Sequence, residues 1–99
     1  MSDVYVKVFR EGSHVLVAAC DADLLGRTLK EGDVVFEVRE GFYGGSLVRV
    51  DKAMGLVREA TCANLVGSTI VDLAVREGLV HPQSVILISG VPHAQIVRM

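Results

Sequence analysis

The sequence predicts one compact α+β domain, with a largely antiparallel or mixed sheet and two main helices packed on one of its faces. Eighteen of the 99 residues are valine, and most stand in short segments where apolar residues alternate with others, as in half-buried strands. Two later segments repeat their apolar residues every three or four positions, which indicates amphipathic helices. With 51% hydrophobic residues, a chain of 99 residues suffices for one sizeable core but not for two.

Strands joined by turns are predicted for the first half of the chain. Asp21 follows the second of these strands and suits the N-cap of a short helix over 22–25. Three glycines surround Phe42 and Tyr43 in the segment 41–45, which predicts a loop. Alternation indicates strands over residues 4–9, 15–19, 34–39 and 47–50, with turns at 11–13 and 30–33, the first of which would close a hairpin.

Both main helices and two further strands are predicted for the second half. Asp51 is the expected N-cap of a helix over 52–60, and Ser68 that of a helix ending near Gly78. Residues 61–66 could extend the first helix or form a short strand, with a break favoured near Thr61. Strands over 85–88 and 94–98 would flank a turn at 90–93. The predicted core consists of the inward-facing apolar residues of these elements: Val6, Val8, Val15, Val17, Phe36, Val38, Leu56, Val57, Ile70, Ala74, Val85 and Leu87.

Charge and hydropathy exclude several classes of protein. Ten basic and twelve acidic side chains give a net charge of −2, so no basic excess points to nucleic acid. No segment approaches the roughly 18 apolar residues of a membrane helix, and the N-terminus lacks the basic start and apolar core of a secretory signal. We therefore expect a cytoplasmic protein without membrane contact. An RNA-binding role would require several of five scattered arginines to form one patch, these five being Arg10, Arg27, Arg39, Arg49 and Arg58.

Cys20 and Cys62 are expected to be buried free thiols, a single disulfide between them being the alternative. Because Cys20 stands at the start of a predicted helix, it could also be a nucleophile with His93 as its base. The neighbouring Asp21 would oppose formation of the thiolate. The histidines and cysteines of the chain show no metal-ligand spacing, so we expect no metal and no cofactor.

Two further patterns mark candidate binding residues. Phe42 and Tyr43 could form an exposed stacking platform for bases, or they could fold back over the core. His93 and Gln95 stand two residues apart and so share one face of the last predicted strand, either as part of a binding surface or as an ordinary solvated face. If that strand lies at the edge of the sheet, its free backbone groups would also allow a homodimer.

Six segments spread over the chain carry a resemblance to a known family. They are 15–21 (VLVAACD), 31–32 with the strand that follows, 42–45 (FYGG), 63–67 (ANLVG), 77–82 (EGLVHP) and 90–95 (GVPHAQ). In these segments the chain resembles, essentially end to end, a mainly archaeal family catalogued as domain of unknown function 424. The resemblance implies an archaeal, cytosolic, stand-alone domain. It transfers no activity and no catalytic residue to any position.

Two functions follow as hypotheses. The first is a non-enzymatic binding module in a macromolecular assembly, one concerned with RNA or translation. The alternative is a small enzyme or ligand-binding protein with a pocket around Cys20, Asn64, His93 and Gln95. A concave pocket favours the ligand hypothesis, and a flat surface of aromatic and arginine side chains favours a macromolecular partner. The candidate binding residues are Cys20, Phe42, Tyr43, Asn64, His93 and Gln95.

Overall fold

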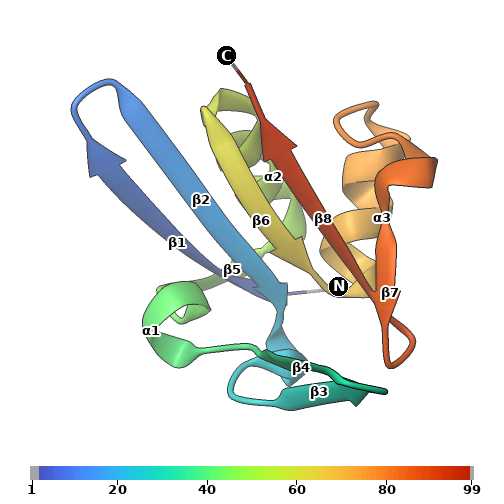
Figure 1. Ribbon diagram of the computed structural model, residues 1–99. Helices are drawn as coiled ribbons and strands as arrows, with labels where there is room; N and C mark the ends of the chain where they lie inside the picture. Colours follow the sequence, from blue (N-terminus) through green and yellow to red (C-terminus); the bar gives the residue numbers. More distant parts are fainter. Residues whose placement is uncertain (1–2, 99) are drawn as a thin grey trace.

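The structure, a computed structural model, describes residues 3–98 as a six-stranded sheet with two main helices and a separate two-stranded hairpin (Figure 1). The strands of the sheet are β1 (Asp3–Glu11), β2 (His14–Asp21), β5 (Ser46–Arg49), β6 (Cys62–Val66), β7 (Ile86–Ile88) and β8 (Val91–Val97). They lie in the order β5-β1-β2-β6-β8-β7. All neighbours are antiparallel except β2 and β6, which are parallel. The predicted α+β class with a mixed sheet is confirmed.

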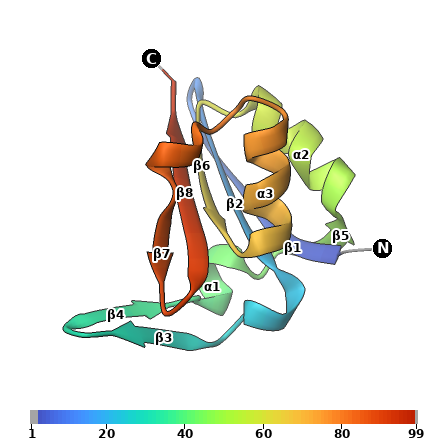
Figure 2. The same ribbon diagram turned by 90° about the vertical axis from the view of Figure 1, so that its right-hand side faces the viewer.

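Two helices, α2 (Val50–Glu59) and α3 (Ser68–Arg76), cover one face of the sheet (Figure 2). Alternate residues of each strand point toward them, because successive side chains of a strand face opposite sides. No helix within residues 3–98 is both long and apolar enough to span a lipid bilayer. The strands and helices form the main core together, with Val4, Val6, Val17, Ala19, Leu65 and Ile96 from the sheet and Met54, Val57, Ile70, Val71 and Ala74 from the helices.

The second face of the sheet, away from α2 and α3, is only partly covered. Its cover consists of a 3-10 turn, η1 (Ala22–Leu24), the hairpin β3 (Thr28–Glu31) and β4 (Val34–Glu37), and a short helix, α1 (Glu40–Tyr43). These elements form a second apolar cluster with Ala18, Cys20 and Val66. Farther along the second face Gln95 is exposed, and Val97 keeps 73% of its surface accessible. The second face therefore has a covered part over β1 and β2 and an open part over β6 and β8.

Asp21 caps the N-terminus of α3. Its carboxylate accepts hydrogen bonds from the backbone N–H groups of Thr69 at 2.9 Å and Ile70 at 3.1 Å. Gly67 makes room for this contact, because a Cβ there would lie 2.6 Å from both carboxylate oxygens and the backbone φ is +115°. The predicted position of Asp21 is confirmed, since it is the N-cap residue of η1, but its side chain forms no capping hydrogen bond there. The predicted cap of α3 is wrong, because Ser68 is the first residue of that helix and Gly67 is its N-cap.

Several predicted boundaries differ from the structure. Part of the loop predicted at 41–45 is the helix α1, and β3 precedes the turn predicted at 30–33. Most of the turn predicted at 90–93 is the start of β8. Asp51 lies in the first turn of α2 and is not its N-cap. The predicted break near Thr61 is confirmed, since the residues that follow form β6.

One of the twelve predicted core residues is wrong. Leu87 is 59% exposed, because it lies on the outermost strand β7 and its side of that strand is left uncovered. The other predicted core residues are buried or partly buried. Phe36 and Val38 belong to the cluster on the second face, and the rest belong to the main core.

The C-terminal strand β8 lies second from the edge of the sheet, between β6 and β7. β7 pairs only with its first three residues, Val91–His93, so within the described chain the stretch 94–97 has a strand partner on one side alone. A homodimer through this strand stays a prediction, and it is restricted to that short stretch.

Candidate functional site

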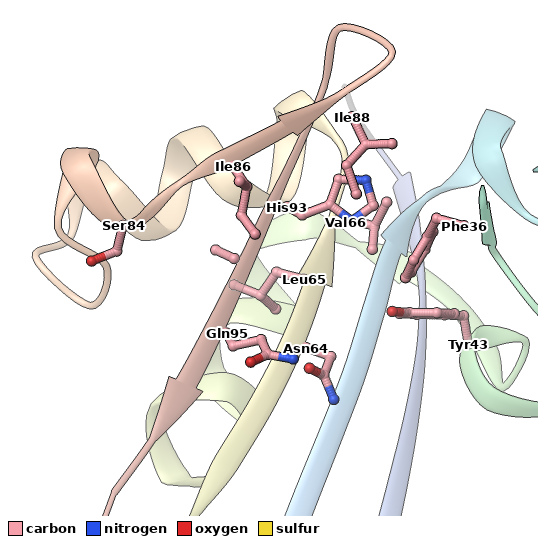
Figure 3. Close-up of a pocket in the computed structure, with 11 residues that line it drawn as sticks. Phe36, Tyr43, Asn64, Leu65, Val66, Ser84, Ile86, Ile88, His93 and Gln95 are labelled. Carbon is pink, nitrogen blue, oxygen red and sulfur yellow. The ribbon is translucent and has the colours of Figure 1, made fainter. Parts of the chain in front are cut away.

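A cavity of about 450 Å³ lies on the second face of the sheet, over β6 and β8 (Figure 3). Its floor includes Asn64 and Val66 from β6 and His93 and Gln95 from β8. Phe36 of β4 and Tyr43 of α1 form one wall, and Ile86 and Ile88 of β7 form the other. We call it the β6–β8 cavity. Its volume lies within the range of about 300–1,000 Å³ that is typical of small-molecule sites.

Strand register brings the polar residues of the floor together. Val66 lies opposite His93 in the antiparallel pair of β6 and β8, and Asn64 lies opposite Gln95. Since residues two apart in a strand share a face, all four side chains point into the β6–β8 cavity. Figure 3 shows the two carboxamides side by side on the floor. The predicted common face of His93 and Gln95 is confirmed.

The imidazole of His93 is buried without a hydrogen-bond partner at one nitrogen. The residue is 7% exposed, and its Nε2 has no partner among residues 3–98. Phe36 contacts the ring in an edge-to-face arrangement, with ring centroids 4.5 Å apart and planes at 89°. Burial lowers the pKa of His93 below its ordinary value of 6.5. The imidazole is therefore neutral at pH 7.

Neither carboxamide on the floor of the cavity takes part in the hydrogen bonds that hold the described part of the fold together. The side chains of Asn64 and Gln95 make no hydrogen bond to any residue of the described chain. Each carboxamide presents a carbonyl acceptor and an NH₂ donor. The sequence holds three carboxamide side chains in all, so two of the three meet in this cavity.

The aromatic residues form a packed wall. Tyr43 is buried, and its ring meets Phe42 edge to face at 4.9 Å. Phe42 in turn stacks on Phe9 at 5.4 Å. Phe42 and Tyr43 are therefore folded back over the second face and form no exposed platform. Burial raises the pKa of Tyr43 to about 12, and the nearby Cys20 thiol adds to the shift, so the phenol stays neutral.

Phe42 lines a smaller hollow next to the β6–β8 cavity. This hollow has a volume of about 300 Å³, and Phe36, Tyr43 and Asn64 line both. Arg39 and Glu37 also line this smaller hollow, with the guanidinium Nε of Arg39 3.8 Å from the Glu37 carboxylate. The aromatic residues Phe36 and Tyr43 therefore contribute to two neighbouring hollows.

Cys20 lies under the cover of the second face and does not line the cavity. It is fully buried, and burial raises the pKa of its thiol to about 12, with Asp21 and Asp23 adding to the shift. Val66 stands between Cys20 and His93 in the strand register, which places the two residues two strand spacings, roughly 9–10 Å, apart. The structure therefore contradicts the predicted nucleophile–base pair of Cys20 and His93.

Both cysteines are free thiols, and Cys62 is partly exposed. We expect a thiol reagent such as DTNB to label the native protein at Cys62 only, because the Cys20 thiol is buried and protonated. Cys20 should react only after unfolding in denaturant. Replacing Cys62 with serine should abolish native labelling, whereas rapid labelling of that variant would show that Cys20 is accessible.

The lining of the β6–β8 cavity is neutral. It contains no aspartate, glutamate, lysine or arginine, and the pKa shifts of His93 and Tyr43 both favour their uncharged forms. Within residues 3–98 no group of three or more histidine, cysteine or acidic side chains could hold a metal ion. The geometry suits hydrogen bonding to an uncharged molecule.

Three of the wall residues were not predicted as part of a site. Ile86 and Ile88 alternate along a predicted strand, so their common face could have been read from the sequence. Phe36 was assigned to the core alone. Its position beside His93 depends on the hairpin β3–β4, which the Glu31 side chain ties to the β7–β8 turn by accepting a hydrogen bond from the Ser89 backbone N–H at 2.7 Å.

The buried His93 predicts a pH dependence of stability. Its folded-state pKa lies below the unfolded value of 6.5, so its stabilising contribution is complete above pH 6.5 and is lost as pH falls through the folded-state pKa. We expect the free energy of unfolding of a His93→Phe variant to fall less over this acidic range than that of the wild type. Urea unfolding at several pH values measures the difference, and parallel curves would contradict it.

Comparison with known proteins places this arrangement in a family. A family model described as "Protein of unknown function (DUF424)" matches residues 9–99. A crystal structure of an uncharacterized conserved protein from Methanopyrus kandleri is similar, with a TM-score of 0.82 and 30% sequence identity over 98% of this chain and 94% of that one. The comparison with curated proteins finds no significant match. Since the family model covers most of the sequence and the structural match runs nearly end to end, the chain belongs to the DUF424 family.

Proposed function

We propose that the protein binds a small neutral ligand in the β6–β8 cavity and acts as a binding protein. The observation that carries this proposal is the unpartnered Nε2 of the buried His93, which lines the same cavity as two unused carboxamides. A buried polar atom without a hydrogen bond costs about 1–3 kcal/mol, and native proteins leave few such atoms. A ligand that bonds to His93 would remove this cost on binding.

Binding is favoured over covalent catalysis because the cavity lacks an activated nucleophile. Cys20, which the sequence offered as a possible nucleophile, lies outside the cavity, and its high pKa keeps the thiol protonated. The titratable groups in the lining, His93 and Tyr43, are both neutral at pH 7.

The arginines give little support to an electrostatic RNA-binding face. Arg58 of α2 pairs with Glu77 at 2.7 Å on the helix side of the sheet. Arg39 lies beside α1 on the second face, close to Glu37. Because these two arginines lie on opposite sides of the sheet, they cannot both belong to one basic patch. Membership in an RNA or translation-related assembly remains a prediction.

Titration of the ¹⁵N-labelled protein with benzamide and with benzoate would test the proposal. The two probes have the same size, but only benzoate is charged. We expect benzamide to shift the side-chain NH₂ signals of Asn64 and Gln95, and benzoate to bind at least tenfold more weakly. Changes confined to the helix side, or equal binding of both probes, would contradict a neutral site.

A matched pair of variants locates the binding. Gln95→Met removes one carboxamide from the cavity with little change in size, whereas Gln83→Met makes the same change in η2 (Pro82–Ser84), outside the cavity. We expect the first variant to weaken benzamide binding about tenfold, the value of one hydrogen bond. The second should leave it unchanged.

A further inference from the structure

The β6–β8 cavity differs in chemistry from the other hollows of the molecule. Hollows of similar volume beside α3 and β5 include charged residues such as Asp72 and Arg76, or Asp51 and Lys52. Among the buried side-chain nitrogen and oxygen atoms of residues 3–98, the Nε2 of His93 alone lacks a hydrogen-bond partner. The β6–β8 cavity is therefore the hollow best suited to a specific uncharged ligand.

We propose that this ligand is a nucleobase, held by its hydrogen-bonding edge on the floor of the β6–β8 cavity and by its faces between the two walls. This inference rests on the proposed function, since it names the class of molecule that the same site would take. The same hydrogen-bonding edge and flat ring are present in a free base or nucleoside and in an unpaired base of an RNA strand, so either molecule could supply the ligand.

The floor supplies the hydrogen bonds that a base edge requires. Asn64 and Gln95 lie directly opposite each other in the strand register, and each offers one acceptor and one two-hydrogen donor. His93 adds a third neutral group, two residues closer along β8 to the turn between β7 and β8. Nucleobase edges alternate donors and acceptors, and carboxamide side chains pair with them through two hydrogen bonds. A simple hydrocarbon ligand would leave all three groups without partners.

The walls suit a flat molecule. Phe36 and Tyr43 present aromatic surface on one side of the floor, and Ile86 and Ile88 present aliphatic surface on the other (Figure 3). Ile86 is 63% exposed, although it belongs to the wall of the cavity. A planar ring placed between the walls would cover part of its side chain and would contact aromatic surface, as bases do in single-strand binding proteins.

The absence of charge in the lining separates a base from other polar ligands. A phosphate or carboxylate recognised inside the cavity would need a cationic partner or a cluster of backbone donors, and the lining contains no lysine or arginine. The sugar and any phosphate must therefore point out of the cavity. We expect a nucleoside and its monophosphate to bind with equal affinity.

Isothermal titration with adenosine, guanosine, cytidine and uridine tests the proposal, with ribose as the control that lacks a base. We expect at least one nucleoside to bind saturably, and ribose to give no heat. Asn64→Leu and Gln95→Met should each weaken the preferred nucleoside about tenfold, and Gln83→Met should not. Circular dichroism of each variant checks that it is folded.

Benzamide separates failure of this inference from failure of the proposed function. If benzamide binds at the cavity and no nucleoside does, the nucleobase inference is overturned and the small-ligand function stands. If neither benzamide nor any nucleoside binds, both are overturned. Nucleoside binding that is equally strong in the Asn64→Leu and Gln95→Met variants would also overturn the inference.

Single-stranded RNA hexamers of the preferred base distinguish the two sources. Binding at least tenfold tighter than that of the nucleoside, and weakening steeply with salt, would assign the site to a base within a strand. Equal affinity for hexamer and nucleoside, independent of salt, would assign it to a free base or nucleoside. Both results support the shared base chemistry of the cavity.

Discussion

Replacement of Ala74 by aspartate is expected to lower the free energy of unfolding by about 3–5 kcal/mol. Ala74 is fully buried on α3, within the core between the helices and the sheet. An aspartate there would place a charge, or a protonated carboxyl without a partner, among apolar side chains. Urea denaturation followed by circular dichroism measures the loss.

Asp72 on the same helix provides a control for this substitution. It is exposed, two positions before Ala74 in the sequence. Asp72→Ala should change the free energy of unfolding by less than about 0.5 kcal/mol, as surface substitutions usually do. An Ala74→Asp variant with the unfolding midpoint of the wild type would show that this face of α3 is not buried.

Replacement of Asp21 by alanine is expected to cost about 2–4 kcal/mol, because two backbone N–H groups at the start of α3 lose their acceptor. The N–H group of Ile70 is buried, so water cannot fully replace the carboxylate. Asp23→Ala, at an exposed position in η1, should have little effect. Denaturant unfolding of both variants measures the difference, and equal small losses would contradict the capping role of Asp21.

A double-mutant cycle with Gly67→Ala sharpens this prediction. In the wild-type background the new methyl group would meet the Asp21 carboxylate, but in the Asp21→Ala background that space is empty. The cost of Gly67→Ala should therefore be smaller in the second background, by about 1 kcal/mol or more. The loss of unfolding free energy that Gly67→Ala still causes in the Asp21→Ala background measures the backbone strain of alanine at a φ of +115°. Additive costs would show that the carboxylate does not occupy this space.

Much of the fold could be predicted because strands and helices impose local periods. The alternation of Val4, Val6 and Val8 places all three on the helix side of β1, and the spacing of Ile70 and Ala74 places both on the buried side of α3. The cap of α3 could not be read in this way. Asp21 lies 48 residues before Thr69, and the two meet only because β2 and β6 pair in parallel.

The candidate site could be predicted in part for the same reason. His93 and Gln95 share a face through the period of a strand, whereas Asn64 joins them through the register of β6 with β8. Cys20 faces the same side of the sheet, but η1, α1 and the hairpin cover it, which no local pattern indicates. The position of the aromatic wall likewise depends on contacts of the hairpin with distant parts of the chain, such as that of Glu31 with Ser89.

The ring ¹⁵N resonances of His93 test the central claim most directly, because the claim is that a ligand in the β6–β8 cavity satisfies its Nε2. His14 and His81 are exposed and lie outside the cavity, so they serve as controls within the same spectrum. We predict that saturation with benzamide or with the preferred nucleoside shifts the Nε2 signal of His93 and leaves the other two histidines unchanged. An unchanged His93 signal in the presence of every probe would contradict the account.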